Sequence, residues 1–298
     1  MESDLIRWLR TRLPQRDNVL VGPGDDAAVL RTGENIIVTT DMLMEGVDFL
    51  LSEVDPRRIG RKALAVNLSD LAAMAAKPLA AFVSLCLPRS GGEALARELY
   101  EGMLPLADEF ACSIAGGDTN SWDGPLVISV TAIGEAIARG PLLRRGARPG
   151  DAILVTGEFG GSIHAHHFDF RPRVREALWL QHHFELHAGT DVSDGLSLDL
   201  SHICEESDVG AILDEAAIPL RPVVGNDLNH ALADGEDFEL VLAIPRAQAL
   251  RLIDTQPLAH AKLSLIGEFT AAPGLQLRDA DGLLRPLVPR GFEHKLKG

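Results

Sequence analysis

Hydrophobic and polar positions alternate along the chain in two patterns, one typical of strands and one typical of helices. The two patterns follow one another, so they predict strands interspersed with helices. Residues 35–40 form an apolar run typical of a buried strand that ends at Asp41. A helix is predicted to begin at Asp55, with Pro56 in its first turn, and to be stopped by Pro78. The same criteria predict strands at residues 79–87 and 126–133 and helices at residues 3–13 and 92–111.

A run rich in arginine, glycine and proline at residues 139–150 interrupts this pattern, and we interpret it as the crossover between two domains. The alternation then resumes, with strands predicted at residues 152–156, 189–192, 238–244 and 262–268 and helices at residues 174–184, 196–207 and 246–255. We therefore predict a two-domain α/β or α+β protein with domains at residues 1–138 and 139–298.

Composition and charge narrow the class of protein. With 298 residues, of which 46% are hydrophobic and 24% charged, the chain is typical of a globular protein large enough for two domains. Its formal net charge of −15 argues against nucleic acid and anionic membranes as partners. We expect a cytoplasmic protein, since the N-terminal residues lack the apolar core of a signal peptide and the three cysteines are too scattered for a disulfide framework.

Five short acidic motifs are the strongest indication of function. Each places an aspartate beside glycine, serine, threonine or asparagine in otherwise apolar sequence, at residues 22–29, 39–42, 67–74, 116–119 and 191–195. A buried carboxylate is costly unless it is paired or binds a metal ion. Oxygen ligands of this kind suit Mg²⁺, which proteins often bind together with phosphate groups. The motifs therefore indicate phosphoryl chemistry in which bound cations offset negative charge.

Each motif also has a purely structural interpretation. Glycine, proline and aspartate favour turns, which would account for the first and fourth motifs, and the second could be a strand-to-turn junction. Ser193 or Asp194 could be the N-cap of the following helix, although the free N–H groups of a helix N-terminus also attract anions. Asn67 and Asp70 share one face of an apolar helix, where we favour a ligand role for Asp70 over a buried hydrogen-bond network.

Six of the ten histidines cluster within residues 164–187, which raises the question of a transition-metal site. They are His164, His166, His167, His182, His183 and His187. The stretch at residues 164–173 looks like an exposed loop, and no His-Glu-x-x-His or paired Cys/His spacing accompanies it, so we expect no structural metal ion there. The chain also lacks a P-loop, so ATP would require a different scaffold.

Taken in order, the motifs resemble those of the thiamine-monophosphate kinases, a family within the ATP-binding superfamily that also contains aminoimidazole ribonucleotide synthetase. The resemblance extends over essentially the whole chain. Beyond the five motifs it includes Arg-Lys-Ala-Leu-Ala-Val at residues 61–66, Arg-Arg-Gly-Ala-Arg-Pro-Gly-Asp at residues 144–151, Gly-Glu-Asp-Phe-Glu-Leu at residues 235–240 and Gly-Phe-Glu-His at residues 291–294.

The resemblance implies an aminoimidazole ribonucleotide synthetase-like fold. Its N-terminal domain would bind ATP and Mg²⁺ and dimerise through its sheet, and its C-terminal domain would be mixed α/β. It also implies an enzyme, a phosphotransferase that converts thiamine monophosphate to thiamine diphosphate with ATP as co-substrate and several Mg²⁺ ions. The partners implied are these small molecules and a second copy of the chain.

By motif position, the resemblance implies roles for individual residues. The expected magnesium ligands are Asp26, Thr39, Thr40, Asp41, Asp70, Asp118, Asp191 and Asp194. The expected ATP contacts are Gly117, Asp118, Arg144 and Ser193, and the expected catalytic residues are Asp70, Asp118 and Asp194. Glu236 and Phe292 would contact thiamine phosphate, where an aromatic ring suits stacking on a flat cationic ring.

Two departures from the family concern the acceptor. Asp48 stands where the family usually has a histidine that touches the substrate, so Asp48 joins the expected substrate residues. The segment between residues 157–162 and residues 171–173 is short compared with the family. Two alternatives therefore stay open: a related kinase or ATP-dependent synthetase of the superfamily that acts on a different small acceptor, and a non-catalytic protein that binds nucleotide.

Overall fold

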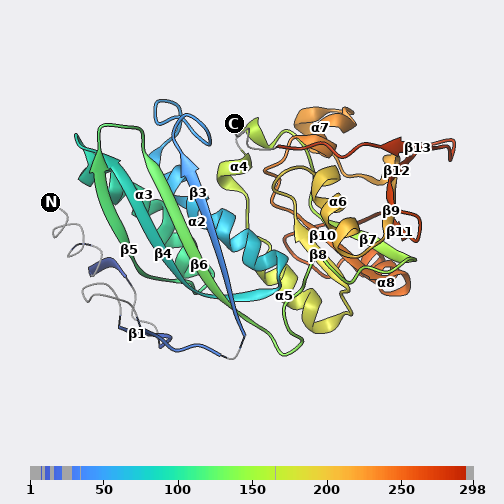
Figure 1. The fold of residues 1–298 in the computed structure, drawn as a ribbon, viewed down its shortest axis with the longest axis horizontal. Coiled ribbons are helices and arrows are strands. Elements are labelled where there is room, and N and C mark those ends of the chain that lie inside the picture. The colour runs from blue at the N-terminus through green and yellow to red at the C-terminus, as the bar shows by residue number, and fades with distance from the viewer. Residues whose placement is uncertain are drawn as a thin grey trace. The chain divides into compact units, whose positions relative to one another are not determined.

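The structure is a computed structural model of the chain, and it describes residues 8, 11–13, 17–21, 29–33, 35–164 and 166–292. The chain forms two compact units. Unit 1 contains Met1–Leu71 and Ala76–Ala138, and unit 2 contains Ala72–Ala75 and Arg139–Gly298. Figure 1 shows the elements of both units, coloured along the chain.

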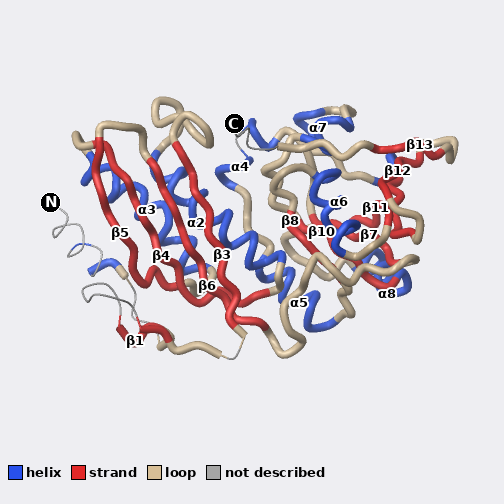
Figure 2. The backbone as a smooth tube through the Cα atoms, in the orientation of Figure 1, coloured by secondary structure: helices blue, strands red, loops and turns tan. Residues whose placement is uncertain are grey.

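Unit 1 is built on a four-stranded sheet with the strand order β3-β6-β4-β5, shown in red in Figure 2. Its strands are β3 (Ile36–Met44), β4 (Ala76–Pro88), β5 (Ser113–Trp122) and β6 (Val127–Ala136). Strand β6 pairs antiparallel with β3 and β4, whereas β4 and β5 are parallel. A parallel pair requires a crossover, which helix α3 (Gly92–Glu109) provides. A separate antiparallel pair consists of β1 (Val19–Val21) and β2 (Val29–Leu30).

Helix α2 (Pro56–Ala73) begins where the sequence predicts, because the Asp55 side chain accepts a hydrogen bond from the N–H of Arg57 at 2.8 Å. Residues 62–69 are all buried, so the helix is enclosed on nearly every side. The helix ends before Ala75, whose φ of 49° is left-handed. The prediction that Pro78 stops it is wrong, since Pro78 already lies within β4.

Helices α2 and α3 lie on one face of the sheet (Figure 1) and cross each other at two glycines. A Cβ atom added to Gly60 would lie 2.0 Å from the carbonyl oxygen of Leu99, and one added to Gly102 would lie 1.8 Å from that of Arg57. The helix spacing therefore depends on the absence of side chains at the crossing. Arg57 also pairs with Glu101 there, at an N–O distance of 3.1 Å.

The opposite face of this sheet, which we call the outer face, exposes apolar side chains. Successive residues of a strand point to opposite faces. Along β3, Ile37 is buried, whereas Val38 is 60% and Met42 is 58% exposed. The register pairs Val38 with Ile133 and Met42 with Ser129 of β6, so the outer face continues across the sheet.

Unit 2 contains a seven-stranded sheet with the order β13-β12-β9-β11-β7-β10-β8. Its strands are β7 (Asp151–Thr156), β8 (Ala188–Asp191), β9 (Gly210–Asp214), β10 (Leu240–Pro245), β11 (Leu263–Thr270), β12 (Gly274–Arg278) and β13 (Leu284–Leu287). All neighbouring pairs are antiparallel except β12 with β9.

The helices of unit 2 are α4 (His166–Asp169), α5 (Val174–His183), α6 (Leu196–Glu206), α7 (Leu228–Ala233) and α8 (Arg246–Thr255). Buried Leu200 and Ile203 of α6 join a core with strand residues such as Val155 and Val241. Among the helices that the structure describes in either unit, none combines the length and the hydropathy needed to cross a membrane. Among the described residues no disulfide forms between the three cysteines, and Cys86 is only partly buried.

The predicted two-part mixture of helices and strands is confirmed, but two local interpretations are wrong. Residues 39–41 do not end a buried strand; they lie in the middle of β3, an edge strand with exposed residues. Residues 116–119 do not form a loop; they belong to β5, which backbone pairing with β4 holds extended. The helix predicted at residues 3–13 lies mostly outside the described residues.

Candidate functional site

The acidic motifs at residues 39–42 and 67–74 meet in unit 1. The hydroxyl of Thr39, on β3, donates a hydrogen bond to the carboxylate of Asp70, on α2. Asp41 points to the same face of β3 as Thr39, because it lies two positions further along the strand. The charge of Asp70 acts on Asp41, and we call these two residues the acid pair.

Asp41 occupies surroundings that disfavour its charge. Burial first, and the Asp70 carboxylate second, raise the pKa of Asp41 from 3.8 to about 7. Its Oδ2 atom is buried and has no hydrogen-bond partner among the described residues. A divalent cation would relieve both the unpartnered oxygen and the repulsion, so the acid pair fits Mg²⁺.

Other predicted magnesium ligands lie apart from the acid pair. Thr40 points to the outer face, where its hydroxyl accepts a hydrogen bond from Thr131 at 3.0 Å. Asp118 is exposed on β5. The strand register aligns it with Ser84 of β4, Ser129 of β6 and Met42 of β3, so it also lies on the outer face. Asp26 lies outside the described residues. Within the described ranges, no three histidine, cysteine, aspartate or glutamate side chains gather into a metal site.

The glycine before Asp118 has a structural reason. A Cβ atom added to Gly117 would lie 1.9 Å from the carbonyl oxygen of Val83 in the neighbouring strand β4. The φ of Gly117 is 155°, next to an irregularity in the pairing of the two strands. The close pairing of β5 with β4 therefore accounts for the glycine at this position. A contact between Gly117 and ATP stays a prediction.

In unit 2, residues 191–195 connect β8 to α6, and we call them the aspartate turn. Asp191 is buried at the end of β8, while Ser193 and Asp194 are partly exposed. The N-cap of α6 is Gly195, which has no side chain with which to cap the helix. The interpretation of Ser193 or Asp194 as the N-cap is therefore wrong.

Asp199, which the sequence analysis missed, organises the aspartate turn from within α6. Its Oδ2 atom accepts hydrogen bonds from the N–H groups of Asp194 at 3.0 Å and Gly195 at 3.1 Å. Burial raises the pKa of Asp199 to about 7, and the two N–H groups oppose this rise. A carboxyl group of the helix itself thus binds the two N–H groups that directly precede α6. An aspartate four positions after the glycine was the signal available in the sequence.

Arg144 brings positive charge to the aspartate turn. Its Nε atom donates a hydrogen bond to the Thr190 hydroxyl at 3.3 Å, one residue before Asp191. Its charge also acts on Asp199, whose pKa it lowers. A guanidinium that acts on Asp199, next to a turn that also carries Asp191 and Asp194, suits phosphate groups that arrive with a metal ion.

The Gly-Glu-Asp-Phe-Glu-Leu motif at residues 235–240 runs beside the aspartate turn. The N–H of Glu236 donates to the carbonyl of Ser193 at 2.7 Å, and that of Phe238 donates to the carbonyl of Val192 at 2.8 Å. Glu236 and Phe238 have φ values of 53° and 51°, which residues with side chains rarely adopt. Such backbone strain persists only where the surroundings enforce it.

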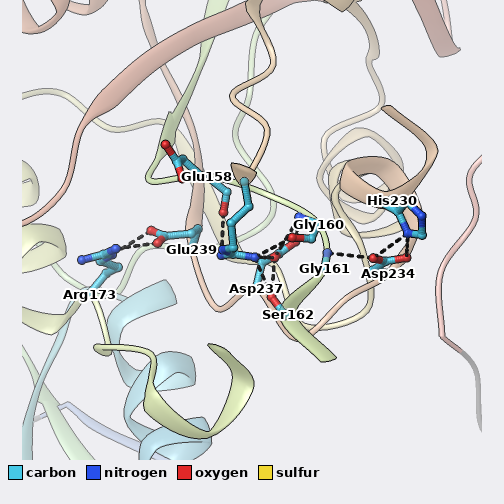
Figure 3. Close-up of polar contacts among 10 residues, drawn as sticks. Glu158, Gly160, Gly161, Ser162, Arg173, His230, Asp234, Asp237 and Glu239 are labelled. Atoms are coloured by element: carbon cyan, nitrogen blue, oxygen red, sulfur yellow. Dashed lines mark hydrogen bonds and ion pairs between the residues drawn. The ribbon is translucent and has the colours of Figure 1, made fainter. Parts of the chain in front are cut away.

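Asp237 and Glu239 of this motif are buried and paired with arginines (Figure 3), and we call them the arginine-paired acids. Arg221 lies 2.7 Å from Asp237, which also accepts a hydrogen bond from the Ser162 hydroxyl at 2.6 Å. Arg173 binds both oxygens of Glu239, through Nε at 2.7 Å and Nη2 at 2.5 Å. These acids are neutralised within unit 2 and serve its structure.

The histidine-rich segment is not an exposed loop, contrary to the prediction. His167 is buried in α4, and its Nδ1 atom lies 2.7 Å from Oε2 of Glu236. Burial and the charges of the two arginines bound to the arginine-paired acids lower the pKa of His166 to about 4. Spacing along the sequence did not reveal these contacts, because the partners come from distant segments.

Two further predicted substrate residues, Asp48 and Phe292, take part in hydrogen bonds within their own units. In unit 1, Asp48 follows β3 and accepts a hydrogen bond from the N–H of Met44 at 2.7 Å, which closes a turn. In unit 2, the N–H of Phe292 donates to the carbonyl of Asp194 at 2.9 Å, and its side chain is 52% exposed. Their contact with a substrate stays a prediction.

Comparison with known proteins covers both units. Residues 24–136 match the AIR synthase related protein N-terminal domain, and residues 148–280 match the corresponding C-terminal domain. The thiamine-monophosphate kinase of Rhodopirellula baltica is 38% identical over 311 residues, which cover 99% of this chain and 97% of that protein. The crystal structure of thiamine-monophosphate kinase from Stenotrophomonas maltophilia matches with a TM-score of 0.80 and 35% identity, over 94% of this chain and 95% of that chain. AaThiL, solved in complex with AMPPCP and TMP, shares the fold with a TM-score of 0.76 and 24% identity, over 99% and 96% of the two chains.

Proposed function

The chain belongs to the thiamine-monophosphate kinase family, and on this premise we propose that it transfers a phosphoryl group from ATP to thiamine monophosphate, yielding ADP and thiamine diphosphate. The observation that carries the proposal is the acid pair, in which a buried carboxylate oxygen without a partner among the described residues lies near a second carboxylate. Relatives of this name that align along almost the entire chain support the same reaction.

The reaction forms a bond between an oxygen of the acceptor phosphate and the γ-phosphorus of ATP. The bond from that phosphorus to the β,γ-bridging oxygen breaks, and ADP leaves. The acceptor oxygen is already anionic at neutral pH, so the transfer needs no general base and no phosphoenzyme. The obstacle is repulsion, because two unit charges about 4 Å apart repel by about 4 kcal/mol at an effective dielectric constant of about 20. The protein must therefore supply positive charge and alignment.

Mg²⁺, when bound, neutralises phosphate charge and aligns the reacting groups. We assign the acid pair to hold it, with the Thr39 hydroxyl fixing the orientation of the Asp70 carboxylate. Thr40 and Asp118 face the outer side of the sheet, so we do not assign them to an ion held by Asp41. Their roles as ligands stay predictions.

In unit 2, we assign the aspartate turn and Arg144 to ATP and its metal ion. Arg144 offers a charged donor to phosphate oxygens, and Asp191 and Asp194 offer carboxylates to Mg²⁺. Asp199 supports the shape of the turn before any ligand arrives, since it binds two of its N–H groups. Ser193 of the same turn completes the proposed set.

We also propose a cytoplasmic homodimer formed through the outer face of the unit 1 sheet. The exposed apolar side chains of β3, Ile36, Val38, Met42 and Met44, support this, because apolar side chains gathered on one exposed face favour a contact surface. In this proposal residues 1–138 form the domain that dimerises and binds ATP and Mg²⁺, and residues 139–298 form the α/β domain.

Incubation of the purified chain with ATP, Mg²⁺ and thiamine monophosphate tests the proposed function, with thiamine diphosphate read by fluorescence after oxidation. We expect Mg²⁺-dependent product, an equal amount of ADP, and no labelled protein when the γ-phosphate of ATP is labelled. If the protein phosphorylates another small molecule and not thiamine monophosphate, that molecule becomes the acceptor in the proposed reaction. ATP binding without turnover would favour a nucleotide-binding protein.

A further inference from the structure

A buried imidazole holds the carboxylate of Glu236. Nδ1 of His167 lies 2.7 Å from Oε2 of Glu236, which is a hydrogen-bond distance. The side chain of His167 is 5% exposed, whereas that of Glu236 is 33% exposed. The contact therefore joins an interior group to a carboxylate that a ligand can reach.

The backbone around Glu236 is fixed from both sides. Its φ of 53° is costly and is maintained by the hydrogen bond from its N–H to Ser193 at 2.7 Å. The next residue, Asp237, is anchored by Arg221 at 2.7 Å. The backbone of Glu236 is therefore held in place, and His167 contacts the carboxylate at the end of its side chain.

A second contact attaches α4 to the same motif. The ring of Phe170, directly after α4, stacks on that of Phe238 with centroids 4.1 Å apart and 18° between the planes. His167 and Phe170 thus place α4 against the two non-glycine residues of the motif that have positive φ. This support comes from the segment at residues 157–173.

We propose that His167 is a positioning residue that orients the Glu236 carboxylate towards the cationic thiamine part of the acceptor. The inference rests on the proposed function, because it requires Glu236 to contact that acceptor. A mobile glutamate would lose side-chain freedom on binding, whereas one already bonded to His167 has lost it on folding. Removal of the imidazole should weaken acceptor binding by about 5- to 10-fold and leave ATP binding unchanged.

Two substitutions at one position separate orientation from packing. His167→Phe keeps a buried ring and removes the hydrogen bond, and His167→Asn keeps an N–H donor near the place of Nδ1. We expect His167→Phe to raise KM for thiamine monophosphate by about 5- to 10-fold, with KM for ATP and the thermal midpoint unchanged, and His167→Asn to restore most of the loss. His182→Phe, at an exposed position of α5, is the matched control and should change neither KM.

A double-mutant cycle with Glu236→Gln tests whether His167 acts through Glu236. In the Glu236→Gln background, His167→Phe should cause no further rise in KM for the acceptor. If His167→Phe does not fold, His167→Ala, which does not overfill the site, takes its place in the cycle.

The failure of this inference is distinguishable from failure of the proposed function. Wild-type protein that forms no thiamine diphosphate would overturn the proposed function and the inference with it. With an active wild type, multiplicative effects of the two substitutions, an equal rise in both KM values, or no rescue by His167→Asn would overturn the inference alone.

Discussion

Two regions of the molecule bury carboxylates and stabilise them in opposite ways. In unit 2, each arginine-paired acid has a guanidinium nitrogen within 2.7 Å. In unit 1, the charged group that acts on partly buried Asp41 is another carboxylate, that of Asp70. The chain itself completes the first arrangement, whereas we propose that a cation from outside completes the second. Ligands are therefore to be sought where buried acids face each other.

The pKa directions express the same contrast. Burial raises the pKa of Asp237, but the Ser162 hydroxyl and the Arg221 guanidinium oppose that rise. For Asp41, burial and Asp70 act in the same direction and raise the pKa to about 7. Both acids belong to short acidic motifs of similar appearance, so composition alone does not separate a structural acid from a metal ligand.

The largest expected effect comes from breaking a buried ion pair. Arg173→Met leaves the Glu239 carboxylate, 3% exposed, without its bidentate partner. We expect the free energy of unfolding to fall by about 3–5 kcal/mol in urea denaturation, and the double variant Arg173→Met/Glu239→Leu to recover much of this loss. Arg89→Met, at the exposed pair with Asp123, is the control and should cost at most about 1 kcal/mol. Equal losses at the two pairs would contradict the explanation.

The second largest effect is expected at the acid pair of unit 1. Asp41→Asn should lower kcat by about 10²- to 10³-fold, or about 3–4 kcal/mol of transition-state free energy, because it weakens the hold on Mg²⁺. The free energy of unfolding should hold or rise, because the repulsion by Asp70 disappears. Asp123→Asn, on an exposed residue, is the control for charge removal. A stability loss as large as that of Arg173→Met, or full activity, would remove the difference between the two regions.

The smallest effect concerns His166, near the arginines of unit 2. Burial and the charges of Arg221 and Arg173 lower its pKa from 6.5 to about 4. Between these pKa values the unfolded chain binds a proton at His166 and the folded chain does not. The stability that neutral His166 contributes is therefore fully present above pH 6.5 and is lost as the pH falls to about 4. Partial exposure of the ring screens the effect. His166→Asn should flatten the fall of the unfolding midpoint over this range, and parallel profiles for variant and wild type would argue against it.

Sequence pattern predicted the fold best where one periodicity runs without interruption. Helices α2, α3 and α6 appear at their predicted places, since each combines apolar spacing with a start or stop residue. The short strands β9, β12 and β13 were missed, because the alternation of apolar and polar residues repeats too few times within four or five residues. Strand β5 was read as a loop because its glycine, aspartate and asparagine favour turns, whereas backbone pairing with β4 decides its structure.

The candidate site was predictable as a set of motifs but not as a set of contacts. The approach of Thr39 and Asp41 to Asp70 follows from a strand and a helix that pattern analysis recognises. In contrast, 66 residues separate Arg173 from Glu239, and nothing in either local sequence indicates the other. His167 was missed for the same reason, since its partner Glu236 lies far along the chain.

The glycine crossing of α2 and α3 limits how the gene can vary. Every missense change of a glycine codon adds a side chain, and at positions 60 and 102 that side chain would meet a carbonyl oxygen at 2.0 or 1.8 Å. Because α2 also carries Asp70, a displaced helix moves the acid pair. A mutational library selected for growth should therefore be depleted at these two codons as it is at the aspartates, and tolerance alone would not tell a spacer from a ligand.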